Sequence, residues 1–192
     1  MTVVLGGSRN LNRLPEEVTL RLQTWSDQGV DFLVGDAPGI EAVFQAWLRR
    51  SEYRNVRVFT SAPEVRNNLG NWPVVRVDSG LRSRGSAMHT AKDREMTRIA
   101  DAGLMMWDGE SAGTLANVLD LAGQGKDAYL YVDRGGDLWH FEGGLGLGDF
   151  VRDYEGPLAE AEKRLRQYAK RKAKRVQEEH SDTLFGDLPW PS

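Results

Sequence analysis

Short apolar runs recur along this chain, and segments with helical periodicity separate most of them. The five clearest runs span residues 2–5, 31–34, 56–59, 103–107 and 128–132. Runs of this length are typical of buried strands, and the amphipathic segments between them are typical of helices that cover a sheet. Strands that alternate with helices form βαβ units, so we expect an α/β fold with a mostly parallel sheet wrapped on both faces.

Glycine, proline and serine divide the remaining sequence into elements. Helices are expected at residues 15–28, 39–50, 92–100 and 114–122, and a further extended stretch at 72–77. The Gly-rich turn at 134–137 predicts an antiparallel edge strand at 138–141. Two segments rich in glycine, 78–91 and 143–148, are expected to be loops, and the first of them is expected to be long and mobile.

The C-terminal segment differs in character from the rest of the chain. Apolar side chains recur at helical spacing from residue 157 to about residue 168, and predict a helix that runs to about residue 179. Residues 157–179 contain eight basic and four acidic residues, a net charge of about +4. We therefore expect a binding domain over residues 1–150 and a basic helix with a flexible tail over residues 151–192.

The composition of the 192 residues excludes several classes of protein. There is no cysteine, so no disulfide framework, cysteine nucleophile or thiolate metal site can form. No apolar run is long enough to span a bilayer, and the N-terminus has no signal-peptide pattern. A net charge of −3 gives no general reason to expect nucleic-acid binding. We expect a cytoplasmic protein without a membrane partner.

Three turns at predicted strand ends have residues suited to binding an anion. They are Gly6–Arg9, Gly35–Gly39 and Asp108–Thr114. The carboxyl ends of parallel strands share one edge of a sheet, where ligands of such folds bind. Glycines allow close approach of backbone N–H groups, and the start of a following helix favours negative charge. Hydroxyl groups and an arginine in these turns add donors for a phosphate.

A more ordinary interpretation of these turns stays open. Glycine and serine also serve simply to reverse the chain and to cap helices. None of the three turns matches the dinucleotide-binding fingerprint or the phosphate-binding lysine motif. Three such turns on one predicted edge nevertheless favour a shared binding site. The histidines lack neighbouring acidic clusters, so no metal is expected, and no cofactor is indicated.

Four motifs together resemble the SLOG superfamily of Rossmann-like domains, and its YspA/YpsA-like branch in particular. They are Gly6–Arg9, Gly35–Glu41, Lys92–Met96 and Ser111–Thr114. The superfamily includes the LOG phosphoribohydrolases and the DNA-processing protein DprA. The resemblance implies a Rossmann-like three-layer αβα sandwich. It also implies a nucleotide or nucleotide-derived ligand, phosphoribosyl or ADP-ribose-like, bound at the strand ends by a sensor or binding module.

Two alternatives follow from the same resemblance. A LOG-like protein would hydrolyse or transfer the N-glycosidic bond of a nucleoside monophosphate. The catalytic glutamate of that motif corresponds to Asn117 here, and an amide cannot act as a carboxylate base. Asp108 and Glu110 are candidates to replace it. A DprA-like protein would instead contact DNA, through the basic helix from Lys163 to Arg175.

The candidate site therefore combines residues from both the turns and the motifs. A homodimer is also expected, as is common for such sheets. The predicted ligand-binding residues are Gly6, Gly7, Ser8, Arg9, Gly35, Asp36, Gly39, Glu41, Arg94, Ser111, Gly113, Thr114 and Asn117, with Asp108 and Glu110 as the catalytic candidates.

Overall fold

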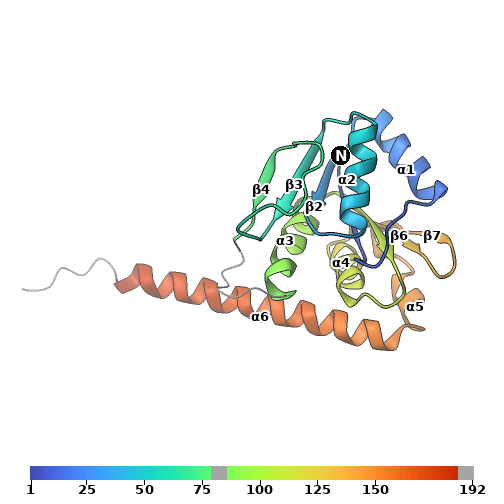
Figure 1. The fold of residues 1–192 in the computed structure, drawn as a ribbon. Helices are drawn as coiled ribbons and strands as arrows, with labels where there is room; N and C mark the ends of the chain where they lie inside the picture. Colours follow the sequence, from blue (N-terminus) through green and yellow to red (C-terminus); the bar gives the residue numbers. More distant parts are fainter. Residues whose placement is uncertain (79–85, 186–192) are drawn as a thin grey trace, which may run out of the picture.

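The protein folds into three layers around one sheet, as the computed structural model shows for residues 1–78 and 86–185 (Figure 1). Seven strands lie in the order β4-β3-β2-β1-β5-β6-β7. All neighbours pair in parallel except the antiparallel pair of β6 and β7. The predicted α/β fold and its edge hairpin are confirmed. The strands are β1 (Thr2–Gly7), β2 (Asp31–Gly35), β3 (Val56–Thr60), β4 (Val74–Arg76), β5 (Ala102–Trp107), β6 (Asp127–Val132) and β7 (Asp137–Phe141).

Helices cover both faces of this sheet. One buried cluster joins the sheet to α1 (Glu16–Asp27) and α2 (Ile40–Arg50). A second cluster, on the other face, joins it to the remaining helices. These are α3 (Ser86–Ile99), α4 (Ala112–Gly123), α5 (Leu147–Val151) and the first part of α6 (Glu155–Phe185), with a short 3-10 turn at Glu142–Gly144. The two clusters form the cores of a three-layer sandwich, as the alternating sequence pattern predicts.

The order of the strands reverses between β1 and β5. The chain moves outward from β1 through β2 and β3 to β4, and then returns to place β5 on the free side of β1. In open parallel sheets such a reversal leaves a crevice at the carboxyl ends of the two strands. The pairing aligns Gly7 with Met106, so the turns that follow β1 and β5 begin side by side.

Three local predictions are wrong. Residues 86–91, predicted as part of a loop, form the first turns of α3, while 79–85 lie outside the described residues. The glycines at 143–148 do not form a loop throughout, because α5 begins at Leu147. Gly144 has a φ of +86° and lies against Ala122 of α4, so this segment is packed. The C-terminal helix continues to Phe185, further than its apolar stripe predicts.

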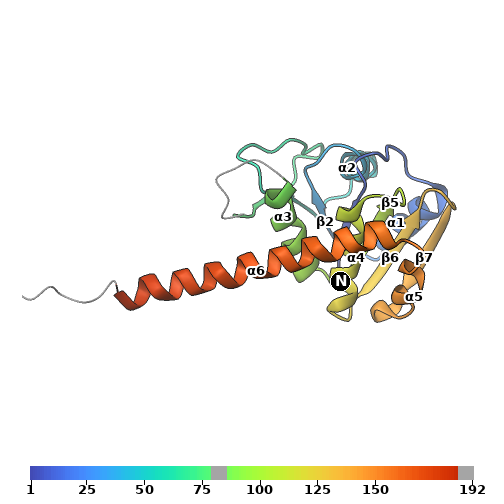
Figure 2. The ribbon, with the colours of Figure 1, turned by 90° about the horizontal axis from the view of Figure 1, so that it is seen from below.

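Helix α6 is only partly attached to the domain. Its first half lies across α4 and α3, and its second half extends past α3, away from the sheet (Figures 1 and 2). Ala161 is fully buried there, and Leu158 and Leu165 pack against the same cluster as α4. Beyond Tyr168 the described side chains are exposed. No helix in the described residues combines the length and the apolar character needed to cross a bilayer.

We expect that a charged side chain introduced at position 161 detaches α6 from the rest of the domain. Ala161→Glu places a carboxylate in the α4–α6 contact, where Ala161 is fully buried. The expected loss is about 2 kcal/mol of unfolding free energy, measured by urea denaturation. The control is Ala159→Glu, at an exposed position of the same helix, which should change stability little. Equal stability of the two variants would contradict the docking of α6.

Candidate functional site

A cavity of about 590 Å³ opens at the carboxyl ends of β1 and β5. It lies at the reversal of strand order, where ligands of parallel sheets bind. Turns after β1, β2 and β5 line it, together with α3, the start of α4 and one turn of α6. The lining residues are Gly7, Ser8, Arg9, Asn10, Ala37, Pro38, Glu41, Lys92, Asp93, Arg94, Asp108, Glu110, Ser111, Gly113, Thr114, Ala116, Asn117, Arg164 and Leu165.

A hydrogen bond joins the turns after β1 and β5, and both of its residues line the cavity. The Ser8 hydroxyl donates to a carboxylate oxygen of Asp108 over 2.6 Å, and the Ser8 N–H donates to the Met106 carbonyl over 2.8 Å. This close approach depends on Gly7, which has a φ of +151° and would place a Cβ 2.2 Å from the Met106 oxygen. Gly7 is therefore needed for backbone contact between strands, which is a structural role.

Asp108 is held as a carboxylate by four donors. Besides Ser8, these are the Asn10 side-chain amide and the backbone N–H groups of Glu110 and Ser111. Burial raises the pKa of Asp108, but these hydrogen bonds to its charged form outweigh burial and lower the pKa overall. Asp108 is therefore ionised at neutral pH, and its role here is to hold two turns together.

The start of α4 presents free backbone donors to the same space. Ser111 caps the helix by accepting hydrogen bonds from the Thr114 N–H and hydroxyl groups. The N–H groups of Ala112 and Gly113 have no acceptor in the described part of the chain. Such unpaired N–H groups and the helix dipole together favour an anion at this position.

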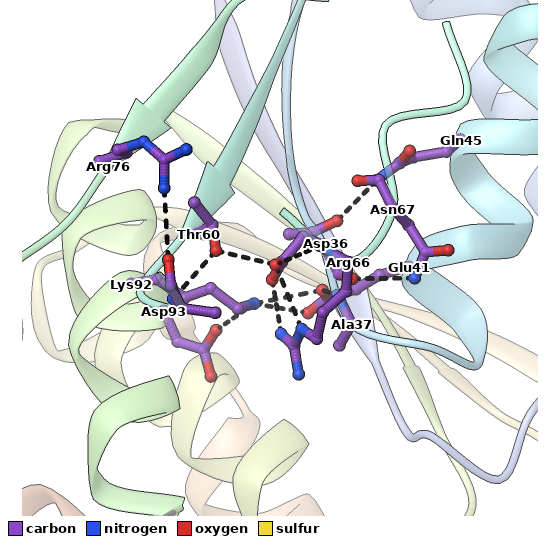
Figure 3. A network of polar contacts seen from close by, with 12 residues as sticks. Asp36, Ala37, Glu41, Gln45, Thr60, Arg66, Asn67, Arg76, Lys92 and Asp93 are labelled. Carbon is purple, nitrogen blue, oxygen red and sulfur yellow. Dashed lines mark hydrogen bonds and ion pairs between the residues drawn. The ribbon is translucent and has the colours of Figure 1, made fainter. Parts of the chain in front are cut away.

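Buried ion pairs connect α2 and α3 where these helices line the cavity. The Lys92 ammonium group, almost fully buried, lies 2.9 Å from carboxylate oxygens of both Glu41 and Asp93 (Figure 3). Burial lowers the pKa of Lys92, but these two carboxylates raise it by more, so the amine stays charged. The Glu41 carboxylate also accepts the N–H of Ala37 over 2.7 Å. Lys92 is thus paired with two carboxylates, and these three groups together carry a net charge of about −1.

The structure places Asp36 away from the cavity, although the sequence predicts that it binds ligand. Its fully buried carboxylate accepts hydrogen bonds from the Arg66 guanidinium group and the Thr60 hydroxyl group (Figure 3). Burial raises the pKa of Asp36, and the bonds to Arg66 and Thr60 lower it by more. Asp36 joins the ends of β2 and β3 to the 61–67 segment, which is a structural role.

Arg94 lines the cavity and is 5% exposed. Its terminal nitrogens reach the Asp120 carboxylate over 2.9 Å, the Ala116 carbonyl over 3.1 Å and the side-chain oxygen of Asn117. Its Nε atom is buried without a hydrogen-bond partner. Arg94 thus fixes Asn117 and α4, and retains one unsatisfied donor beside the cavity.

The predicted residues divide into two groups. The residues that do not line the cavity support it: Gly35 and Gly39 allow close packing, Gly6 lies within β1, and Asp36 is paired with Arg66. The residues that line it are Gly7, Ser8, Arg9, Glu41, Arg94, Asp108, Glu110, Ser111, Gly113, Thr114 and Asn117.

The sequence did not identify every lining residue. Lys92 and Asp93 belong to the Lys92–Met96 motif, but the sequence did not predict that they line the site. Arg164 and Leu165 come from α6, more than forty residues after the last predicted site residue. Arg164 also lines an adjoining hollow with Gly156 and Glu160. No local pattern marks an arginine that reaches a site through helix docking, so only the tertiary structure could place it there.

Every carboxylate that lines the cavity is already engaged. Glu110 forms an ion pair with Arg134, and Glu41 and Asp93 share Lys92, while Asp108 accepts four hydrogen bonds. Among the described residues no group of three or more histidine, aspartate or glutamate side chains could hold a metal ion. The cavity therefore combines carboxylates that are engaged within the chain with unpaired donors at the start of α4, where an anion can be held.

Comparison of the chain with protein-family models, curated proteins and solved structures gave no match. The resemblance to the SLOG superfamily therefore stays a prediction from four motifs.

Substitution of Gly35 should test the Lys92–Glu41 ion pair directly. A Cβ at Gly35 would lie 2.1 Å from both a Glu41 carboxylate oxygen and the Lys92 amine. Gly35→Ala should separate this pair and lower the unfolding free energy by about 3 kcal/mol, measured by urea denaturation. Gly148→Ala is the control, because open space surrounds that helical glycine. If Gly35→Ala were as stable as the control, the ion pair would not be the constraint at this position.

Asp36→Asn should make stability less dependent on pH in acid. The lowered pKa of Asp36 means that its stabilisation is present above its ordinary value of 3.8 and is lost as pH falls through the folded value. We expect the variant to be about 3 kcal/mol less stable at pH 7, because Arg66 loses its partner. The difference should shrink below pH 3.8. The exposed Asp153, as Asp153→Asn, is the control, and a difference independent of pH would contradict the assignment.

Proposed function

We propose that this protein binds a nucleotide or nucleotide-derived ligand in the cavity, as a sensor or binding module. The phosphate of a phosphoribosyl or ADP-ribose-like compound would lie at the first turn of α4. The observation that carries the proposal is the convergence of unpaired donors on one cavity from turns about a hundred residues apart in the chain. Such donors are favourable only when an anion or water accepts their hydrogen bonds.

The donors at the first turn of α4 match the chemistry of a phosphate group. Gly113, whose N–H has no acceptor in the described part of the chain, lines the cavity together with Ser8 and Ser111. Arg9 is exposed, lines the cavity and forms no ion pair in the described part of the chain. An unpaired arginine fork beside helix N–H groups is a typical phosphate-binding arrangement.

The dimensions and lining of the cavity suit a nucleotide. Its volume of about 590 Å³ falls within the range of small-molecule sites. Asn10 and Asp93 provide groups that can hydrogen-bond to a sugar, since amide and carboxylate oxygens accept from hydroxyls. Asn10 comes from the turn after β1 and Asp93 from α3, so two separate elements supply these groups.

The hydrolase alternative is favoured less by this geometry. A catalytic carboxylate must approach the reacting atoms, and the candidates Asp108 and Glu110 are engaged with other groups of the chain. The amide of Asn117 is itself bound by Arg94. The DNA-associated alternative stays a prediction, as do the homodimer and the cytoplasmic location. In α6, Lys163 and Arg166 form ion pairs within the helix, so its unbalanced positive charge lies further along.

Calorimetric titration with five compounds tests the proposal. The compounds are the four common nucleoside monophosphates and ribose 5-phosphate. We expect at least one to bind, and Arg9→Gln to weaken that binding about tenfold, as loss of a charged hydrogen bond does. The control is Arg13→Gln, in the same loop, whose arginine makes only a 3.7 Å pair with Asp133.

The same experiment distinguishes binding from chemistry. Release of free base from a bound monophosphate, lost in Glu110→Gln, would favour the hydrolase. Binding of none of the five compounds would overturn the proposed function.

A further inference from the structure

The guanidinium group of Arg164 lies beside the first turn of α4, where the helix dipole already places partial positive charge. Its terminal nitrogen Nη1 would lie 3.4 Å from a Cβ added to Gly113, in the first turn of α4. The positive end of a helix dipole repels cations, and such a contact is unfavourable unless negative charge lies between the groups. Glu160 supplies only part of that charge, because its carboxylate lies 3.3 Å from Nε and is shared with Lys163.

The two terminal nitrogens of Arg164 remain available. Neither has an acceptor in the part of the chain that the structure describes. The Arg164 side chain is 38% exposed, whereas Arg166, two residues further along α6, is 65% exposed and lies outside the cavity. Both arginines form the same type of pair with a glutamate four residues earlier. Only Arg164 therefore combines that pair with a position in the site.

A second arginine that lines the same cavity keeps one unsatisfied donor. The Nε atom of Arg94 is buried without a partner, while the rest of that guanidinium group is bound to α4. Arg94 comes from α3 and Arg164 from α6, so two helices other than α4 direct arginines to the cavity. Asp120 balances the charge of Arg94, so Arg9 and Arg164 are the lining cations that remain for a ligand. Two such cations from separate elements suit a ligand with two negative charges, as a phosphate monoester has.

We propose that Arg164 binds the phosphate of the ligand, so that a bound phosphate monoester joins α4 to α6 and strengthens the docking of α6. This inference rests on the proposed function and assigns a contact and a regulatory consequence to the same site. The attachment of α6 is limited, because the buried Ala161 and the partly buried Leu158 and Leu165 form most of its apolar contact. A ligand that contacts Arg164 only when α6 is docked must favour the docked state by linkage.

The consequence concerns the exposed half of α6. Past Tyr168 the helix carries the exposed basic residues Lys170, Arg171 and Lys172. The 31-residue helix is about 46 Å long at the usual rise per residue, so its basic half projects from the domain (Figure 2). Occupation of the cavity would therefore set how firmly this basic arm is held to the domain.

The test compares Arg164→Gln with Arg166→Gln in the full chain. Each variant loses one helix ion pair, but only the first loses a cavity residue. Calorimetric titration with the four nucleoside monophosphates and ribose 5-phosphate should show binding about tenfold weaker in Arg164→Gln and within about twofold of the native protein in Arg166→Gln. Arg164→Lys, which keeps the charge but not the fork, should recover part of the loss.

Hydrogen exchange of residues 158–168 provides the readout of docking. A saturating concentration of the compound that binds should slow exchange there in the native protein and in Arg166→Gln, and should slow it much less in Arg164→Gln. Equal affinities of the two glutamine variants, or no slowing of exchange in the native protein, would overturn this inference and leave the proposed function standing. If none of the five compounds bound the native protein, both would be overturned.

Discussion

The pairing of β1 with β5 is the constraint on which the rest of the site depends. It aligns Gly7 with Met106, and the absence of a side chain at Gly7 lets the two backbones approach. Ser8 and Asp108, a hundred residues apart, then meet at 2.6 Å. Because Asp108 also binds the N–H groups of Glu110 and Ser111, the same contact fixes the entry to α4. Without it, the free N–H groups of α4 would have no defined position relative to the turn after β1.

Charged groups in this protein have two distinct roles. The buried charges around the cavity, such as Lys92 with Glu41 and Asp36 with Arg66, are paired within the chain and hold loops and helices in place. Breaking such pairs is costly because it leaves a desolvated charge. The groups without partners are Arg9, the terminal nitrogens of Arg164 and the first N–H groups of α4. They are all donors, and they surround one space, which is why we assign the binding of an anion to them.

The sequence predicted the fold well because hydrophobic periodicity is a local signal that βαβ units follow closely. It also placed the turns after β1 and β5 at one edge, since parallel strands leave no other arrangement. It could not separate Asp36 from Glu41: both follow β2, and only the position of Arg66 shows that Asp36 is paired away from the cavity. Arg164 was missed for a related reason, because its place depends on how α6 docks against α4. Glycine content also suggested loops where α5 and the start of α3 are helical.

The most direct test of the central claim, that separate turns surround one anion, is an NMR titration of ¹⁵N-labelled protein with ribose 5-phosphate. A phosphate oxygen accepting hydrogen bonds at the start of α4 shifts the amide protons of Ala112 and Gly113 downfield. We expect these two amides, followed by those of the Ser8 turn, to show the largest changes. Changes centred on the basic half of α6, or no changes at α4 at saturating ligand, would contradict the claim.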